Sequence, residues 1–173
     1  MCFTDECGGG VKVILVSACL LGHHTKYNGG SNDHNLLMKY DEKGQFVAVC
    51  PECLGKMPIP HPASEIHGGT GKDVLADKAK VMSNQQEVVT VNFLSGAQRV
   101  LEIAKQYHIK AAIFKERSPS CGVHQIYDGT FSGKKMDGEG VATALLRENG
   151  IDVYSDEEIT EALLKKLISE NHG

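Results

Sequence analysis

The sequence predicts an α/β fold, a three-layer sandwich with a mostly parallel, Rossmann-like sheet. Short runs of β-branched and other apolar residues alternate along the chain with longer segments of helical periodicity, and this order is typical of α/β folds. No internal repeat and no low-complexity segment interrupts it. We therefore expect a single domain over residues 11–173, preceded by a polar, glycine-rich and flexible N-terminal extension over residues 1–10.

Short apolar segments supply the expected strands of the sheet. They are residues 11–16, 46–49, 111–114 and 151–154. Pro51 ends the second of them, since proline cannot donate to a central strand ladder. We expect residues 126–131 to form a β-hairpin, because Asp128-Gly129 is a favoured two-residue turn.

Helical periodicity and capping residues predict the remaining elements. Helices are expected over residues 32–41, from Thr90 as N-cap, and over residues 140–148. Ser155 and Glu158 have the spacing of a capping box, which predicts that the last helix begins there. Residues 51–71 hold four of the five prolines and are expected to form a long, ordered loop of functional importance.

Composition and charge narrow the class of protein. The net charge is −4 and the basic residues are scattered, so we expect no extended nucleic-acid groove, while a small-molecule ligand is compatible. No apolar stretch is long enough to cross a bilayer, and no secretory signal begins the chain. We therefore expect a cytoplasmic protein whose six cysteines remain reduced.

Three cysteines follow expected strands at or shortly after their ends. Cys19, Cys50 and Cys121 would therefore meet at the carboxyl edge of a parallel sheet, where α/β folds bind ligands. Three converging thiolates suit an iron–sulfur cluster or zinc. Each cysteine, taken alone, is equally compatible with a small buried residue.

The other cysteines are not expected as ligands. Cys53 forms a C-x-x-C with Cys50, but no second such pair completes a zinc site, and the residues that follow do not favour the helix a thioredoxin-like motif opens. Cys2 and Cys7 lie in the expected extension. Residues 68–72 are not a P-loop, because Asp73 follows Lys72 and no clear strand or helix is expected on either side. We interpret them as a glycine turn.

Several motifs together resemble those of the 2-thiouracil desulfurase family. They are Val16-Ser17-Ala18-Cys19-Leu20-Leu21-Gly22, Cys50-Pro51-Glu52, Lys115-Glu116-Arg117-Ser118-Pro119-Ser120-Cys121-Gly122 and Ile126-Tyr127-Asp128-Gly129-Thr130-Phe131-Ser132-Gly133. The resemblance covers nearly all of the chain after about Lys12. The sequence departs from the family pattern at Lys26 and His61, where the family tends to have arginine.

The resemblance implies a [4Fe-4S] enzyme that removes sulfur from a small thiolated uracil-type base. It places the cluster ligands at Cys19, Cys50 and Cys121, with one iron open to the substrate's sulfur. Glu52 and Ser118 are the implied catalytic residues, and Glu116 is a further acid–base candidate. It leaves the physiological substrate and the oligomeric state open.

Other interpretations of the same residues remain open at the level of sequence. Glu52 is equally compatible with a loop carboxylate that accepts backbone N–H bonds. Of the serines that flank Pro119, we expect Ser120 to satisfy the backbone of the turn. Two other functions are kept: a non-catalytic zinc- or cluster-binding module, and a cluster-free enzyme with a cysteine nucleophile.

Overall fold

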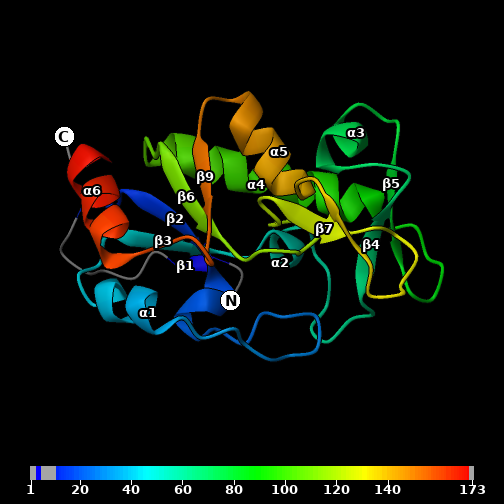
Figure 1. Cartoon of the computed structure of the whole chain (residues 1–173), viewed down its shortest axis with the longest axis horizontal. Helices are drawn as coiled ribbons and strands as arrows, with labels where there is room; N and C mark the ends of the chain where they lie inside the picture. The colour runs from blue at the N-terminus through cyan, green and yellow to red at the C-terminus, as the bar shows by residue number, and fades with distance from the viewer. Residues whose placement is uncertain (1–2, 5–10, 172–173) are drawn as a thin grey trace.

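The central sheet has four parallel strands and one antiparallel edge strand (Figure 1). The computed structural model describes residues 3–4 and 11–171. In spatial order the strands are β1 (Phe3–Thr4), β3 (Phe46–Val49), β2 (Ile14–Ser17), β6 (Ala111–Phe114) and β9 (Asp152–Ser155). The expected mostly parallel sheet is confirmed, although the strand expected from residue 11 is β2, which begins at Ile14.

Alternating side chains of the strands divide the core into two layers of contacts. Leu15 on β2 packs with the face that carries α4 (Thr90–Gln106) and α5 (Val141–Glu148). Its neighbour Ile14 packs on the opposite face, together with residues of α1 (Asn35–Asp41) and α6 (Glu161–Asn171). Figure 1 shows these helices on the two sides of the sheet. The three-layer prediction is confirmed.

The long loop expected at residues 51–71 is wrong in part, because it contains regular structure. α2 (Pro51–Leu54) begins directly after β3, and β4 (Ser64–His67) pairs antiparallel with β5 (Lys80–Ser83). α3 (Gly71–Leu75) begins at the last residue of this segment. The hydrogen bonds between β4 and β5 join positions that are distant in sequence, so local composition does not reveal them.

The expected hairpin at residues 126–131 is also wrong. β7 (Gln125–Tyr127) does pair with β8 (Lys135–Asp137), but Tyr127 faces Lys135, so a longer loop replaces the two-residue turn. The N–H groups of Gly129 and Phe131 donate to the carboxylate of Glu65, at 3.0 and 3.2 Å. This tertiary contact with β4 prevails over the local preference of Asp128-Gly129.

Three predicted helix starts need correction, and the first is α1, which begins at Asn35 rather than at residue 32. Thr90 is the first helical residue rather than the N-cap, which is Val89, and its Oγ1 accepts the N–H of Val81 at 3.0 Å. Half of the capping box forms: the Ser155 N–H donates to Glu158 Oε1 at 2.8 Å, whereas Ser155 Oγ accepts the N–H of Glu157 at 3.1 Å. They close a turn, however, and α6 begins only at Glu161.

The glycine-rich segment at residues 68–72 lies between β4 and α3, contrary to the expectation that no strand or helix flanks it. The start of α3 already holds two carboxylates. Asp73 accepts the N–H of Thr70 at 2.9 Å, and Glu139 accepts the N–H of Lys72 at 3.0 Å. These acceptors occupy N–H groups with which a P-loop would bind phosphate.

Part of the expected N-terminal extension joins the sheet. Phe3 and Thr4 pair with Val49 and Ala48 of β3, and the remaining residues of that segment lie outside the described part of the chain. Among the described helices, none combines the length and apolar character needed to cross a bilayer.

Candidate functional site

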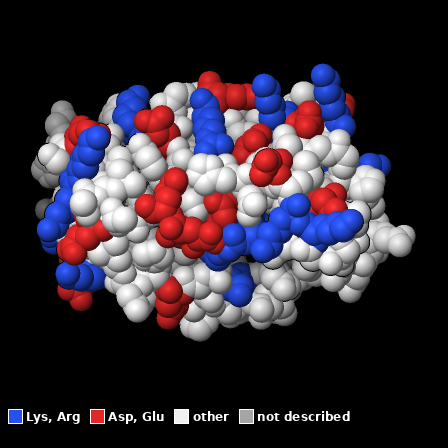
Figure 2. All heavy atoms as spheres, viewed as in Figure 1, with Lys and Arg blue, Asp and Glu red and all other residues white. Residues whose placement is uncertain are grey.

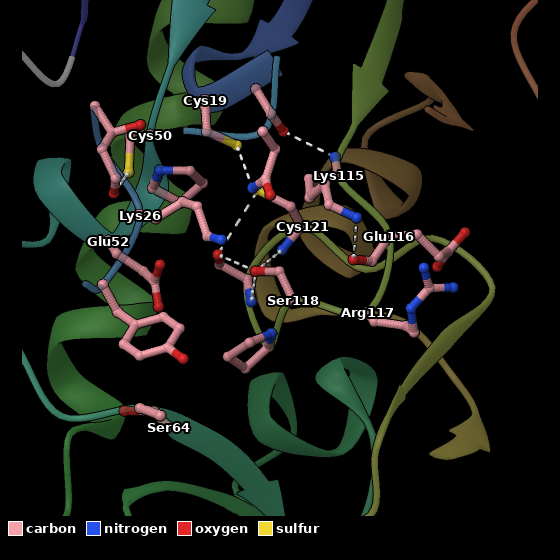
Figure 3. A pocket seen from close by; sticks show the side chains of 18 of the residues that line it. Cys19, Lys26, Cys50, Glu52, Ser64, Lys115, Glu116, Arg117, Ser118 and Cys121 are labelled. Atoms are coloured by element: carbon pink, nitrogen blue, oxygen red, sulfur yellow. Dashed lines mark hydrogen bonds between the residues drawn. The ribbon is translucent and has the colours of Figure 1, made fainter. Parts of the chain in front are cut away.

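The carboxyl ends of β2, β3 and β6 open into one cavity of about 670 Å³. β2 lies between the other two strands, and the chain order of the strands reverses at this point, where α/β folds commonly bind ligands. Cys19 lies in the 3₁₀ turn after β2, Cys50 follows β3 directly, and Cys121 lies in the loop after β6. All three cysteines line this cavity, and Figure 3 shows them around it.

Two of these cysteines, Cys19 and Cys121, have a raised thiol pKa. Burial is the main cause at Cys19, where a hydrogen bond from Asn32 Nδ2 to Sγ, 3.4 Å long, opposes it. Burial also raises the pKa of Cys121 far above its ordinary value, although Ser17 and Ser120 donate to its sulfur. Cys50 raises the pKa of both, so the three sulfur atoms lie within electrostatic reach of one another.

Cys50 has the opposite character, because its pKa is lowered. The main cause is a hydrogen bond from the thiol of Cys53, to which the Cys53 backbone N–H adds, while burial opposes both. Cys50 occupies the N-cap of α2, and Pro51 occupies the first turn of the helix. The C-x-x-C therefore does open a short helix, which corrects the sequence-based expectation, and Pro51 at a first-turn position was the local sign of it.

Cys53 is a neighbour of the cavity rather than part of its lining. It is buried on α2 in the same apolar cluster as Cys50, and the residues that line the cavity do not include it. Its thiol is directed at Cys50. Cys2 and Cys7 lie outside the described residues.

Glu52 lines the cavity and faces a buried histidine. His61 Nε2 lies 3.7 Å from Glu52 Oε1, an ion-pair distance that is too long for a hydrogen bond. His61 Nδ1 lies 2.6 Å from the carbonyl oxygen of Pro58, which fixes the orientation of the ring. The Glu52 carboxylate is the main cause of the raised pKa of His61, and burial opposes it.

The expectation for Ser120 is wrong, because Ser118 and not Ser120 satisfies the backbone of the Cys121 loop. Ser118 Oγ accepts the N–H groups of Ser120 and Cys121, both at 3.2 Å, and so satisfies the backbone of the turn. Ser120 Oγ instead lies 3.6 Å from Cys121 Sγ, to which it donates. Ser118 still lines the cavity, and its hydroxyl lies 3.0 Å from that of Ser120.

Glu116 does not have the properties of an acid–base group. Its Oε1 accepts the N–H groups of Val123, His124 and Gln125 at 2.8, 2.8 and 3.0 Å. Burial alone would raise its pKa, but these bonds and one from Ser155 prevail and lower the pKa to about 2. Glu116 is therefore a charged residue near neutral pH, and it holds the chain after Cys121 in place.

Cationic side chains complete the lining, and two of them are paired. Lys115 Nζ lies 3.7 Å from Asp156, and Arg117 forms an ion pair with Glu157. The third, Lys26, also lines the cavity. Over the wider surface, Figure 2 shows acidic and basic side chains interspersed on one face.

Sequence reasoning missed Asn32 and Glu65. Asn32 donates to Cys19, and Glu65 fixes the loop that contributes Phe131 to the cavity. Neither belongs to a motif that was singled out. Within the described part of the chain, no group of three His, Cys, Asp or Glu side chains is placed to hold a single metal ion.

The protein is thus an α/β protein of the class that binds a ligand where the strand order reverses. Three cysteines and a carboxylate line its cavity there. The model of the 2-thiouracil desulfurase family matches residues 14–158. The chain therefore belongs to the 2-thiouracil desulfurase family, a family of enzymes.

Similar proteins agree with this assignment. The chain is 44% identical over 151 residues to the uncharacterized protein YbbK of Bacillus subtilis (strain 168), covering 87% of this chain and 100% of that protein. It also matches the solved structure of a protein described as [4Fe-4S]-dependent thiouracil desulfidase TudS. That match has 39% identity and a TM-score of 0.78, and it covers 90% of this chain and 99% of the other.

Proposed function

We propose that this protein is a [4Fe-4S]-dependent desulfurase that removes sulfur from thiolated uracil-type bases, with Cys19, Cys50 and Cys121 as the cluster ligands. The observation that carries the proposal is the single cavity that these three thiols share with the carboxylate of Glu52. Membership of the 2-thiouracil desulfurase family supports the substrate class. The similar structure of TudS, described as [4Fe-4S]-dependent, supports the cofactor.

The donor set fits such a cluster. Cys19 and Cys121 have raised thiol pKa values, so they need a bound cation to become thiolates. Held by Cys19, Cys50 and Cys121, the cluster would supply an open iron as a Lewis acid for the thiocarbonyl sulfur.

The reaction is a net hydrolysis and needs no oxidant or reductant. The oxygen of water adds to the thiocarbonyl carbon, the carbon–sulfur bond breaks, and the sulfur leaves as sulfide while a carbonyl forms. Glu52 takes the proton of the attacking water and returns one to the ring nitrogen or the leaving sulfur. Ser118 holds the Cys121 loop through the two N–H groups that it accepts, and it places its hydroxyl at the cavity wall.

We propose that the protein acts in the reducing cytoplasm. Among the described residues, Cys19, Cys50, Cys53 and Cys121 form no disulfide, which supports this proposal. Disulfides are rare in the cytoplasm of most organisms, so thiols there remain available as ligands.

Anaerobic reconstitution tests the proposal. The wild-type protein should take up about four irons, turn brown, and release sulfide from 2-thiouracil. Cys19→Ala, Cys50→Ala and Cys121→Ala should each lose the iron, whereas Cys53→Ala should keep most of it. Loss of iron in Cys53→Ala would contradict the choice of ligands.

The two other functions predict different results in the same experiment. A colourless protein that holds zinc and releases no sulfide would favour the binding module. Sulfide release by iron-free protein would favour a cysteine nucleophile, for which the lowered pKa of Cys50 suits that residue. The two further thiols in the same cavity favour the cluster over both.

A further inference from the structure

Lys26 differs from the other cations of the cavity because it has no carboxylate partner. Lys115 pairs with Asp156 and Arg117 with Glu157, whereas no acidic group of the described residues lies within ion-pair distance of Lys26. Lys26 is half-buried and lines the cavity. A partly desolvated ammonium group without a partner gains from a bound acceptor, because burial weakens its contact with water.

The backbone around Lys26 is fixed next to Cys50. The Lys26 N–H donates to Gly30 O at 3.1 Å, and the Lys26 carbonyl accepts the N–H of Gly29 at 2.8 Å. On the Cys50 side, the carbonyl oxygen of Thr25 lies 3.7 Å from Cys50 Sγ. The backbone of Lys26 is therefore fixed by a hydrogen-bonded turn at the edge of the cysteine site.

The side chain of Lys26 is directed at the interior of the cavity. Figure 3 shows it extending from the side of Cys50 and Glu52 toward the loop of Ser118. The three cysteines, the Glu52 carboxylate and the Lys26 ammonium thus surround one space. The cysteines can bind sulfur, the Glu52 carboxylate can accept a hydrogen bond, and the Lys26 ammonium can donate one.

One edge of 2-thiouracil complements these three groups. The thiocarbonyl sulfur, the ring N–H and the second carbonyl oxygen follow one another around the ring. With the sulfur at the cysteines, the N–H faces a carboxylate acceptor and the oxygen faces a donor. Of the cavity's cations, only Lys26 is free of a carboxylate among the described residues.

We propose that Lys26 is a specificity-determining residue that binds the ring carbonyl oxygen of the thiobase and so selects oxo-thiopyrimidines over thiopyrimidines that lack this oxygen. The inference rests on the proposed desulfurase function and names the part of the substrate that the chain itself recognises. A hydrogen bond to a charged donor of this kind changes affinity by roughly tenfold or more.

Calorimetric titration of reconstituted protein with two ligands that do not react tests this assignment. Uracil carries both ring oxygens, whereas pyrimidin-2-one lacks the oxygen assigned to Lys26 and also the adjacent ring N–H that faces Glu52. Wild-type protein should bind uracil roughly tenfold more tightly than pyrimidin-2-one. Lys26→Met should weaken uracil roughly tenfold and leave pyrimidin-2-one unchanged, so the preference shrinks to the part that the ring N–H supplies, and Lys26→Arg should restore most of the loss.

Lys110→Met is the matched control, since Lys110 is exposed at the opposite end of β6. It should bind both ligands as the wild type does. Equal weakening of both ligands in Lys26→Met, or no change in either, would overturn the assignment, as would a wild-type protein that loads iron but shows no preference. Sulfide release from 2-thiouracil by the wild type checks the proposed function separately, and failure to load iron would overturn both.

Discussion

Glu52 is the carboxylate of the cavity that we propose for proton transfer. Glu116 and Glu65 both accept backbone N–H groups, whereas Glu52 faces the cavity and His61. Glu52→Gln preserves the size of the side chain and removes its basicity. We expect this variant to load iron normally and to release sulfide roughly 10²- to 10⁴-fold more slowly.

Iron content and the rate of sulfide release from 2-thiouracil, measured on the same preparation, check this prediction. Glu102→Gln is a suitable control, because Glu102 lies on the exposed side of α4 and should leave both quantities unchanged. Full activity of Glu52→Gln would assign Glu52 a structural role.

Glu116 should contribute to stability rather than to catalysis. Glu116→Ala leaves three backbone N–H groups without their acceptor, which should lower the free energy of unfolding by about 3 kcal/mol. Because the folded state depresses the pKa of Glu116 to about 2, its stabilisation is fully present above about pH 4.5 and declines as the pH falls toward 2.

Urea unfolding of wild type and Glu116→Ala at several pH values checks this dependence. The difference between the two proteins should be largest near neutral pH and should shrink on acidification. A difference that is constant down to pH 2 would show that the charge of Glu116 is not its source.

At the scale of elements, two glycines let α2 pack directly against α4. A Cβ atom on Gly96 would lie 1.9 Å from Pro51 O, and one on Gly55 would lie 2.0 Å from Asn92 O. Both distances are far below van der Waals contact, so neither site accepts a larger residue without movement. α2 carries Glu52 and follows Cys50, and α4 therefore sets the position of both.

Gly96→Ala should displace α2 and disturb the site from a distance. We expect a loss of stability of about 1–3 kcal/mol and reduced iron loading, measured by thermal unfolding and by iron content after reconstitution. Ser95→Ala, at an exposed neighbouring position of α4, should change neither. Normal iron loading in Gly96→Ala would show that α2 tolerates the shift.

The elements that sequence predicts well here are those specified by local pattern. β3 and β6 are short apolar runs with clear boundaries, and the structure places them where their residues indicate. β4 and the loop after β7 were predicted wrongly, because they depend on contacts between distant residues such as Glu65 and Gly129. The same limit applies to Thr90, whose hydroxyl bonds to Val81 instead of capping its own helix.

The convergence of the three cysteines was predictable from the rule that parallel strands share a carboxyl edge. The hydrogen bonds of individual side chains around the cysteines were not predictable from the sequence. Ser118 and Ser120 differ only in which neighbours their hydroxyls reach, and Asn32 reaches Cys19 through the folding of a loop. Such contacts depend on tertiary geometry, which residue spacing does not contain.

For the whole molecule, a bound cluster should raise thermal stability, because it binds only the folded chain. We expect reconstituted protein to unfold about 5–10 °C above the iron-free protein. The melting temperature of Cys121→Ala should not respond to iron and sulfide. A wild-type protein that binds iron without a change in melting temperature would contradict a site built from three segments of the fold.

The three thiols lie in three separate segments that follow β2, β3 and β6. This arrangement determines whether folding or cofactor binding comes first. A zinc finger gathers its ligands within a short stretch, so the metal can organise the chain. Here the sheet must assemble before Cys19, Cys50 and Cys121 become neighbours. Under the proposed function, we therefore expect iron and sulfide to be delivered to a domain that has already folded.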